Sequence, residues 1–175
     1  MGKERPATPE HSSVAAASYL QVKALHTKAL LLQLQLSMHI NGNRMHALVD
    51  TGAMGNFVSP EFVRRVGAEL TPLKHPRPIL AADGMQMCTC THTARVTAKL
   101  ARAIQVELEF YVVPISSDAI VGLPWLRDHD GDVHTAQHQI TVTIGRRRVT
   151  LNCKNPRDSN YSTEDKPQLI SVQSI

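Results

Sequence analysis

The regular pattern of the chain begins at Leu32, where apolar and polar residues alternate with a period of two. Such alternation is typical of a strand that is buried on one face and exposed on the other. The dipeptide Asn41-Gly42 is a strong hairpin-turn signal, and residues 44–49 return as the partner strand. We therefore expect a hairpin whose second strand leads directly into Asp50. The apolar face of the first strand comprises Leu32, Leu34, Leu36, Met38 and Ile40.

Two short helices are predicted. Residues 60–66 form the first, because Ser59 is a good N-cap, Pro60 suits the first helical position and Gly67 is a typical end signal. Its apolar side comprises Phe62, Val63 and Val66. The second helix is expected over residues 123–128, where a proline is tolerated in the first turn.

The remaining pattern predicts strands. Pro72, Pro76 and Pro78 indicate a loop, after which two strands, residues 79–82 and 85–91, flank the turn dipeptide Asp83-Gly84. Further strands are expected at residues 93–100, 104–113, 139–144 and 147–151, the last two joined as a hairpin. Many short strands with one or two short helices predict an all-β, mainly antiparallel, barrel-like domain.

The length and composition suit one globular domain with tails. The chain has 175 residues, of which 42% are hydrophobic. We expect a disordered or loosely ordered N-terminal segment at residues 1–28, in which 14–28 favour either a helix or a strand. The folded domain is expected at residues 29–152. Residues 153–175 are expected to be a C-terminal tail or linker, in which 169–172 are either linker or a late strand.

Charge and cysteine content narrow the functional classes. The net charge of +4 comes from scattered basic residues and one arginine cluster at 146–148, without the aromatic residues that stack on bases, so direct nucleic-acid binding is not expected. An odd, sparse set of cysteines argues against a disulfide framework and favours a reducing, cytoplasmic environment. No apolar stretch approaches the roughly 20 residues that a membrane helix needs.

Metal binding is not expected either. Cys88, Cys90 and His92 share one face of a predicted strand, but no fourth ligand stands at a familiar spacing, so half-buried strand residues are the better interpretation. We interpret three further histidines as polar loop residues: His129, His134 and His138. No metal or other cofactor is predicted.

The strongest chemical signal is the triplet Asp50-Thr51-Gly52, which follows an apolar run. Such a triplet presents one carboxylate at the end of a strand, and glycines at positions 52 and 55 allow the backbone to bend. An Asp-x-Gly triplet alone is usually just a turn. A second marker, Ala-Ile-Val-Gly-Leu-Pro-Trp-Leu, follows about 70 residues later at 119–126.

Together the two segments resemble the retropepsin family of aspartic proteases. The second segment, followed by Arg-Asp-His-Asp at 127–130, looks most like the protease of Ty3/gypsy-type retrotransposon polyproteins. The resemblance implies a retropepsin-like barrel in which Asp50 is catalytic and Thr51 and Gly52 support the catalytic loop. It also implies a structural turn beneath that loop, formed by Ile120, Val121 and Gly122.

The resemblance further implies residues that bind substrate. Ala53 and Met54 belong to the catalytic loop, and the hairpin turn at Ala82, Asp83 and Gly84 stands where the family has its flap. The residues alone fit an ordinary surface hairpin equally well.

Met54 departs from the retroviral pattern, in which an acidic residue pairs with an arginine just after the downstream glycine. Here Leu123 takes the place of the arginine, so no buried charge is left unpaired.

The chemistry predicts an assembly. Peptide hydrolysis without a metal or a covalent nucleophile needs one carboxylate to deprotonate water and a second, protonated one to donate to the carbonyl. The chain has one Asp-Thr-Gly, so we expect a homodimeric endopeptidase that acts on a peptide or polyprotein, in a retroelement or a host-domesticated derivative. The two carboxyls would share a proton, which favours activity at acid pH. The alternative is a catalytically silent dimerisation or binding module.

Overall fold

The computed structural model describes residues 34–101, 104–154 and 169–174. The N-terminal segment at 1–28, and with it the choice between helix and strand at 14–28, lies outside the described residues. The described helices are α2 (Pro60–Val66) and α3 (Leu123–Asp128). The strands are β1 (Leu34–Ile40), β2 (Asn43–Val49), β3 (Phe57–Val58), β4 (Leu70–Leu80), β5 (Gln86–Ala101), β6 (Ile104–Val112), β7 (Ala119–Val121), β8 (Asp132–His134), β9 (Gln139–Ile144), β10 (Arg147–Asn152) and β11 (Leu169–Ser174).

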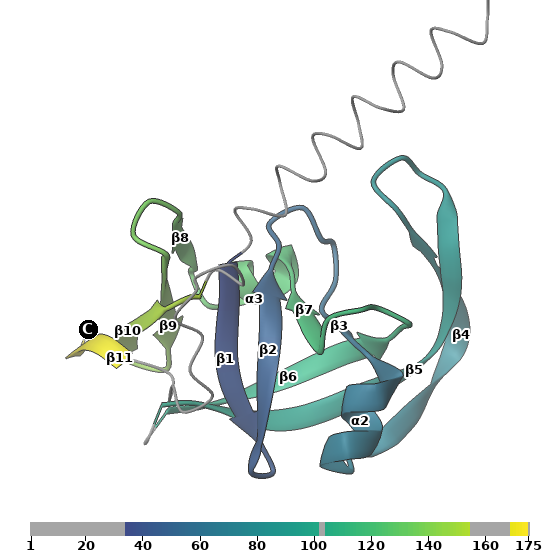
Figure 1. Ribbon diagram of the computed structural model, residues 1–175, viewed down its shortest axis with the longest axis horizontal. Coiled ribbons are helices and arrows are strands. Elements are labelled where there is room, and N and C mark those ends of the chain that lie inside the picture. The colour runs from purple at the N-terminus through teal and green to yellow at the C-terminus, as the bar shows by residue number, and fades with distance from the viewer. Residues whose placement is uncertain (1–33, 102–103, 155–168, 175) are drawn as a thin grey trace, which may run out of the picture. The chain divides into compact units, whose positions relative to one another are not determined.

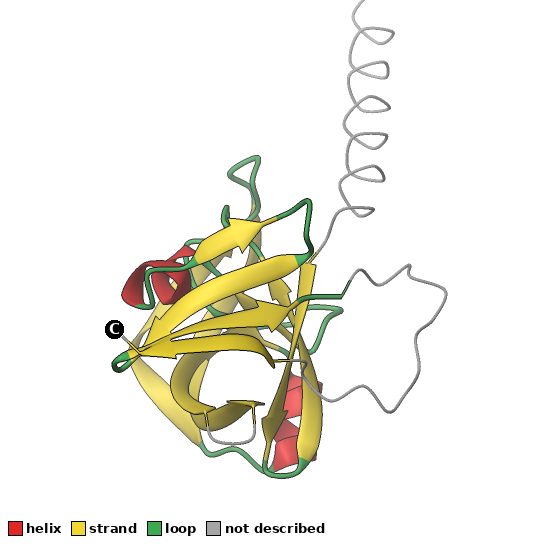
Figure 2. Cartoon of the chain, turned by 90° about the vertical axis from the view of Figure 1, so that its left-hand side faces the viewer, coloured by secondary structure: helices red, strands yellow, loops and turns green. Residues whose placement is uncertain are grey.

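Six of these strands close into a barrel. The larger sheet has the order β1-β2-β7-β3-β6-β5-β4, and an additional pairing of β1 with β5, at His39 and Lys99, closes the ring and leaves β4 outside it. Pairing is antiparallel except between β2 and β7 and between β3 and β6. The curved strands are visible in Figures 1 and 2. The prediction of an all-β, mainly antiparallel barrel with one or two short helices is confirmed.

The β1–β2 hairpin forms as predicted. Its strands pair from Leu34 opposite Val49 to Ile40 opposite Asn43. Asn41 and Gly42 both have positive φ, 49° and 79°, as a two-residue hairpin turn with the twist of its strands requires. The apolar face of β1 is buried, and Ser37 on the opposite face is buried as well.

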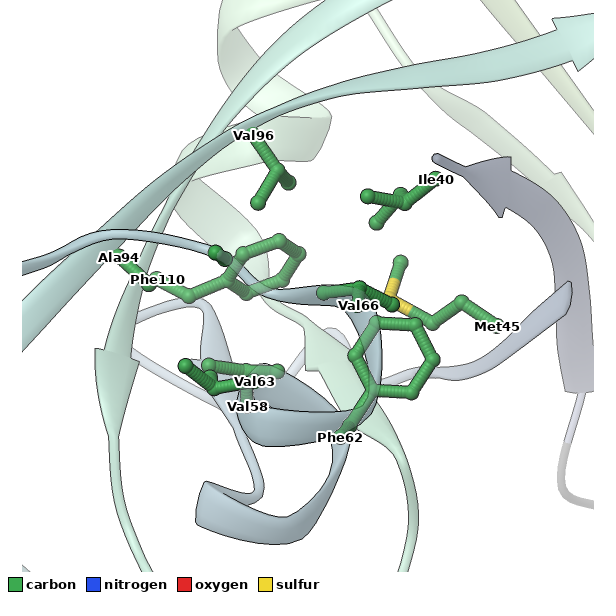
Figure 3. Close-up of a pocket in the computed structure, with 10 residues that line it drawn as sticks. Ile40, Met45, Val58, Phe62, Val63, Val66, Ala94, Val96 and Phe110 are labelled. Atoms are coloured by element: carbon green, nitrogen blue, oxygen red, sulfur yellow. The ribbon is translucent and has the colours of Figure 1, made fainter. Parts of the chain in front are cut away.

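Helix α2 follows its sequence signals. The Ser59 hydroxyl accepts the Phe62 N–H at 3.1 Å, and Gly67 ends the helix in the left-handed conformation with φ 64°. Figure 3 shows the apolar side chains of α2 beside those of the barrel. The space that these side chains line has no room for a water molecule. None of the predicted site residues lines this space, which is part of the hydrophobic core.

The predicted loop at Pro72, Pro76 and Pro78 is wrong, because these prolines lie within strand β4. Proline removes a hydrogen-bond donor and is tolerated in a strand only at the edge of a sheet or at a bulge. Strand β4 meets both conditions, since it pairs with β5 alone and its register shifts between Pro72 and Arg77.

The other differences also concern strand boundaries. The two strands expected at 85–91 and 93–100 are one long strand, β5, which pairs with β4 along one edge and with β6 along the other. The sequence analysis did not find β8. The β9–β10 hairpin is confirmed, and β11 adds to it, so residues 169–172 belong to a strand. These four strands form the second sheet, with the order β11-β10-β9-β8.

The arginine cluster lies at the turn of the β9–β10 hairpin. Arg148 binds two carboxylates, those of Asp130 and Asp132, and the preceding two arginines are exposed. The cluster therefore consists of two exposed arginines and one that is held by ion pairs.

Candidate active site

Asp50 lies where β2 and β7 run parallel. Val49, the last residue of β2, stands opposite Val121, the last residue of β7. The Asp50 N–H donates to the Val121 carbonyl at 3.0 Å, which extends the strand pairing by one residue into the loop. The loop that begins at Asp50 is therefore fixed at its start by backbone geometry.

Asp50 also makes hydrogen bonds within its own loop. Its carboxylate Oδ1 accepts the Gly52 N–H at 2.8 Å, and its backbone carbonyl accepts the Ala53 N–H at 3.2 Å. This is the local turn that aspartate favours, and it restricts the orientation of the side chain. Asp50 is half-buried, while Thr51 and Gly52 are exposed. The three residues thus present a carboxylate and a hydroxyl at the surface of the single chain.

The turn at residues 120–122 lies directly against this loop. The N–H of Leu123 donates to the Ala53 carbonyl at 2.8 Å. Gly122 approaches so closely that a Cβ there would lie 2.3 Å from the Gly55 carbonyl oxygen and 2.6 Å from that of Ala53. These distances are far shorter than van der Waals contact, so only glycine fits.

Asn56 joins the loop to the turn, and the sequence analysis did not single it out. Its Oδ1 accepts the Gly122 N–H at 3.0 Å, and its Nδ2 donates to the Glu109 carbonyl at 3.4 Å. Its own carbonyl accepts the Tyr111 N–H at 2.8 Å. No local pattern indicates these contacts, because each partner is more than 50 residues away in the sequence.

Met54 in the loop is exposed, with 77% of its surface accessible, whereas Ala53 beside it is half-buried. Leu123, which follows Gly122, is half-buried too. An apolar pair therefore stands where the retroviral pattern has an acid and an arginine, and no charge needs a partner here.

The predicted flap turn connects β4 with β5. Ala82, Asp83 and Gly84 are all exposed. The Asp83 Oδ1 accepts the Met85 N–H at 2.9 Å, and Gly84 has φ 83°, which favours glycine. Among the described residues, no hydrogen bond or ion pair joins this turn to the Asp50 loop. The structure thus keeps the two predicted substrate-binding segments on separate elements.

Large apolar side chains are exposed around the flap turn. Leu80, Met85 and Met87 have 57%, 70% and 61% of their surface accessible. Together with Met54 they form a set that we call the exposed apolar residues. Exposed apolar surface at the edge of a sheet is typical of binding surfaces, and methionine adapts to varied partners.

Tyr111 connects the flap strands with the loop. Its hydroxyl accepts the Arg77 Nη1–H at 3.0 Å, and the guanidinium also lies 5.6 Å from the centre of its ring. The rings of Tyr111 and Phe57 lie 6.1 Å apart, and a Cβ at Gly55 would lie 3.0 Å from the Phe57 ring and 3.3 Å from the Tyr111 ring. A chain of contacts therefore runs from β4 through β6 to the loop.

Asp118 fixes the entry to β7. Its two carboxylate oxygens accept the Arg65 Nη2–H at 2.7 Å and the backbone N–H of His46 at 3.1 Å. Burial lowers the pKa of His46, an effect that Asp118 opposes and that Arg44 and other nearby cations reinforce. Burial likewise lowers the pKa of His39.

Two of the thiols, those of Cys88 and Cys90, belong to strand β5, and Cys153 directly follows β10. Cys90 is buried and donates from Sγ to the His92 carbonyl at 3.2 Å, and Cys88 is half-buried. Burial raises the pKa of Cys153 to about 12, so this thiol stays protonated at neutral pH. Within the described ranges, no group of three or more His, Cys, Asp or Glu side chains could hold a metal ion.

In the part of the chain that the structure describes, no helix is both long and apolar enough to cross a membrane.

Comparisons with known proteins give a family match and similar solved structures. The family model for the PEG10/RTL1 protease domain matches residues 46–153, more than half of the chain. The solved retroviral protease-like domain of Ddi1 from Leishmania major is similar at 19% identity, covering 63% of this chain and 84% of that one, with a TM-score of 0.47. EIAV protease, solved with the inhibitor HBY-793, is similar at 19% identity over 55% and 86% of the two chains, with a TM-score of 0.44.

The matched residues include both the Asp50 loop and the Gly122 turn. The resemblance to retropepsin-like proteases of the Ty3/gypsy type is therefore confirmed. The chain belongs to the family of the PEG10/RTL1 protease domain, a retropepsin-like protease domain derived from Ty3/gypsy retrotransposons.

Proposed function

We propose that this chain is one subunit of a homodimeric aspartic endopeptidase, with Asp50 of each subunit in the shared active site. The observation that carries the proposal is the fixed Asp50 loop. The backbone of Asp50 is bound to β7 at 3.0 Å, and its carboxylate is oriented by the Gly52 N–H at 2.8 Å. Fixed orientation of the reacting group is what acid–base catalysis requires.

The proposed mechanism uses the two carboxyl groups in different protonation states. One Asp50 carboxylate takes a proton from water, which attacks the peptide carbonyl, while the protonated Asp50 of the partner subunit donates to the carbonyl oxygen. The C–N bond of this tetrahedral intermediate then breaks as the first Asp50 gives its proton to the leaving amine, and the partner's Asp50 takes a proton back from one hydroxyl of the intermediate. Like charges held close together cannot both ionise, so the pair shares one proton and favours acid pH. Thr51, exposed beside Asp50, would contact the second loop across a two-fold axis.

The proposed substrate is a peptide segment of a polyprotein, in a retroelement or a host-domesticated derivative. The exposed apolar residues of the flap and loop support binding of an extended chain with apolar side chains. Ala82, Asp83 and Gly84 would cover this peptide from the flap, and Ala53 and Met54 would contact it from the loop. The proposed setting is a reducing, cytoplasmic one, which an odd and sparse set of thiols supports.

The direct test is peptide hydrolysis. The purified chain is incubated with a peptide library from about pH 4 to about pH 7, with and without a pepstatin-like inhibitor. We expect inhibitor-sensitive cleavage that Asp50→Asn abolishes without loss of the fold, since Asn keeps the Oδ1 that accepts the Gly52 N–H. Asp128→Asn, at an exposed aspartate at the end of α3, is the matched control and should cleave normally.

Two outcomes would contradict the proposal. Cleavage by Asp50→Asn near the wild-type rate would exclude Asp50 as the catalytic acid or base. A folded, dimeric wild type without any cleavage would instead favour the silent dimerisation or binding module, for which the apolar Met54 in place of an acid is the supporting observation.

The homodimer has its own test. Specific activity should fall as the protein is diluted through the dissociation constant of the dimer. With free exchange of subunits, an equal mixture with Asp50→Asn leaves about a quarter of the dimers wild-type, so activity falls to about half that of the same amount of wild type alone. Constant specific activity in a protein that sediments as a monomer would refute the shared active site.

A further inference from the structure

The buried N–H of Gly122 has a side-chain partner. Strand β7 ends at Val121, so the strand ladder no longer supplies an acceptor for the next residue. Gly122 is buried, and a buried N–H without an acceptor is costly. The acceptor is the Oδ1 of Asn56, at 3.0 Å.

Both ends of the Asn56 amide are in use. The oxygen accepts from Gly122, and the nitrogen donates to the Glu109 carbonyl at 3.4 Å. This assignment of oxygen and nitrogen is the one that satisfies both partners, since an N–H needs an acceptor and a carbonyl needs a donor. The Asn56 backbone is held as well, because its carbonyl accepts the Tyr111 N–H at 2.8 Å.

Three consecutive residues, 121–123, each hold one point of the Asp50 loop. The Val121 carbonyl binds the N–H of Asp50 at the start of the loop, and the Leu123 N–H binds the Ala53 carbonyl in the middle. The Gly122 N–H binds the side chain of Asn56 at the end. The first two contacts are between backbone atoms, so the third is the one that a substitution can remove without changing the backbone.

We propose that Asn56 is a positioning residue for Asp50. Its amide closes the loop onto the Gly122 turn and so restricts the directions in which the carboxylate can point. The catalytic consequence rests on the proposed endopeptidase function, whereas the contact itself does not. Asn56 touches neither the carboxylate nor the predicted flap turn in any hydrogen bond of the described residues, so its effect passes through the loop.

The contact is tested without any catalysis, by amide hydrogen exchange measured by NMR. The Gly122 amide is followed relative to the slowest-exchanging amides of β1, so that a change in global stability cancels. Asn56→Ala removes the acceptor, and we expect exchange at Gly122 to become at least about tenfold faster. Asn56→Asp keeps the acceptor for the Gly122 N–H, although it replaces the donor to Glu109 with an acceptor and adds a negative charge, so exchange at Gly122 should stay within about threefold of wild type.

Asn41→Ala is the matched control. The Asn41 Nδ2 donates to the Val66 carbonyl at 3.0 Å, which ties the β1–β2 turn to α2 at the other end of β2 from Asp50. The Asn41→Ala substitution removes a comparable contact between a side-chain amide and the backbone, but this contact does not involve the Asp50 loop. We expect lower global stability and an unchanged relative exchange rate at Gly122.

Kinetics then separate positioning from simple support of the fold. We expect Asn56→Ala to lower kcat by about tenfold to a hundredfold per folded dimer, with KM changed by no more than about twofold. Asn56→Asp should recover most of kcat, and Asn41→Ala should keep the wild-type value.

The outcomes are distinguishable from failure of the endopeptidase itself. A wild type that cleaves nothing overturns the proposed function, yet exchange at Gly122 still decides whether Asn56 closes the loop. Faster exchange in Asn56→Ala with unchanged kcat would overturn the positioning role. Unchanged exchange in that variant would overturn the contact.

Discussion

The Asp50 loop and the flap turn contain the same local hydrogen bond, but the contacts around this bond differ. In both, an aspartate Oδ1 accepts the N–H of the residue two positions later, at 2.8 Å for Asp50 with Gly52 and 2.9 Å for Asp83 with Met85. The Asp50 loop is also bound to β7 at its start and to Gly122 at its end, whereas the turn around Asp83 is closed by hydrogen bonds among its own residues. The same short-range signal therefore gives a fixed carboxylate in one place and a free-standing turn in the other.

The surroundings differ in burial too. Gly55 and Gly122 are buried against each other beneath the loop. Around the flap turn, by contrast, Leu80, Met85 and Met87 are exposed. A tightly packed loop suits a reacting group that must not move, and an exposed apolar hairpin suits a surface that is completed by a partner or a peptide.

The largest effect is expected from adding one methyl group to the packed region. Gly122→Ala places a Cβ within 2.6 Å of two carbonyl oxygens, and we expect it to cost at least about 3 kcal/mol of unfolding free energy, because backbone atoms would have to move. Gly84→Ala makes the same change in the flap, where nothing lies within 4 Å and only the φ of 83° is unfavourable. It should cost about 1 to 2 kcal/mol. Urea denaturation measures both values.

Equal destabilisation by these two alanines would mean that the loop is no more tightly packed than the flap. The comparison between the two regions would then be wrong.

The sequence predicts the loop region well where its signals are local. Ser59, Pro60 and Gly67 gave the bounds of α2, and Asn41-Gly42 gave the turn of the β1–β2 hairpin. Each of these signals acts through neighbours in the chain, by capping or by allowing a positive φ. The placement of Gly122 against the loop could be expected only from the family resemblance.

What the sequence did not predict depends on distant partners. Strand β4 passes through three prolines because it lies at an edge of the sheet, and its edge position follows from the pairing of the whole sheet. Asn56 is one polar residue in an apolar stretch, and its partners are Glu109 on β6 and Gly122 just after β7. A local pattern carries no information on which strands meet.

The next effect concerns the flap turn, which is the more exposed of the two regions. The double change Met85→Ser and Met87→Ser removes apolar surface that is already exposed, so unfolding free energy should change by less than about 0.5 kcal/mol. If this surface binds peptide, KM should rise by about tenfold while kcat changes little. Leu70→Ser, an exposed apolar residue at the start of β4, is the control and should leave KM unchanged. An unchanged KM in the double variant would remove the flap from the binding surface.

A smaller effect is expected where the two regions connect. Tyr111→Phe removes the hydroxyl that accepts the Arg77 N–H, while it keeps the ring beside Phe57. In a double-mutant cycle with Arg77→Ala, we expect a coupling of about 0.5 kcal/mol in unfolding free energy, because the contact is exposed. A coupling of zero would mean that the hydrogen bond between Arg77 and the Tyr111 hydroxyl adds nothing to the connection between β4 and β6.

The smallest effect is a pH dependence of the unfolding free energy, and it comes from β2, the strand that leads into the Asp50 loop. His46 lies on β2, with its Nδ1 3.4 Å from the Ser37 hydroxyl, and burial lowers its pKa from 6.5. Because the pKa of His46 is lower in the folded state, the unfolded chain takes up a proton first as pH falls. The contribution of His46 to the unfolding free energy is therefore complete above about pH 6.5, and it is lost as pH falls through the pKa of the folded state. His46→Gln should therefore reduce the loss of unfolding free energy between neutral and mildly acid pH. Above about pH 8 the histidine is neutral in both the folded and the unfolded state, so the variant should show only the pH-independent cost of the substitution. Urea denaturation across this range measures the slope, and an identical slope in wild type and variant would exclude His46 as its source. Because a shared carboxyl pair favours acid pH, the strand that presents Asp50 loses stability on the same side of neutrality on which the proposed chemistry would work best.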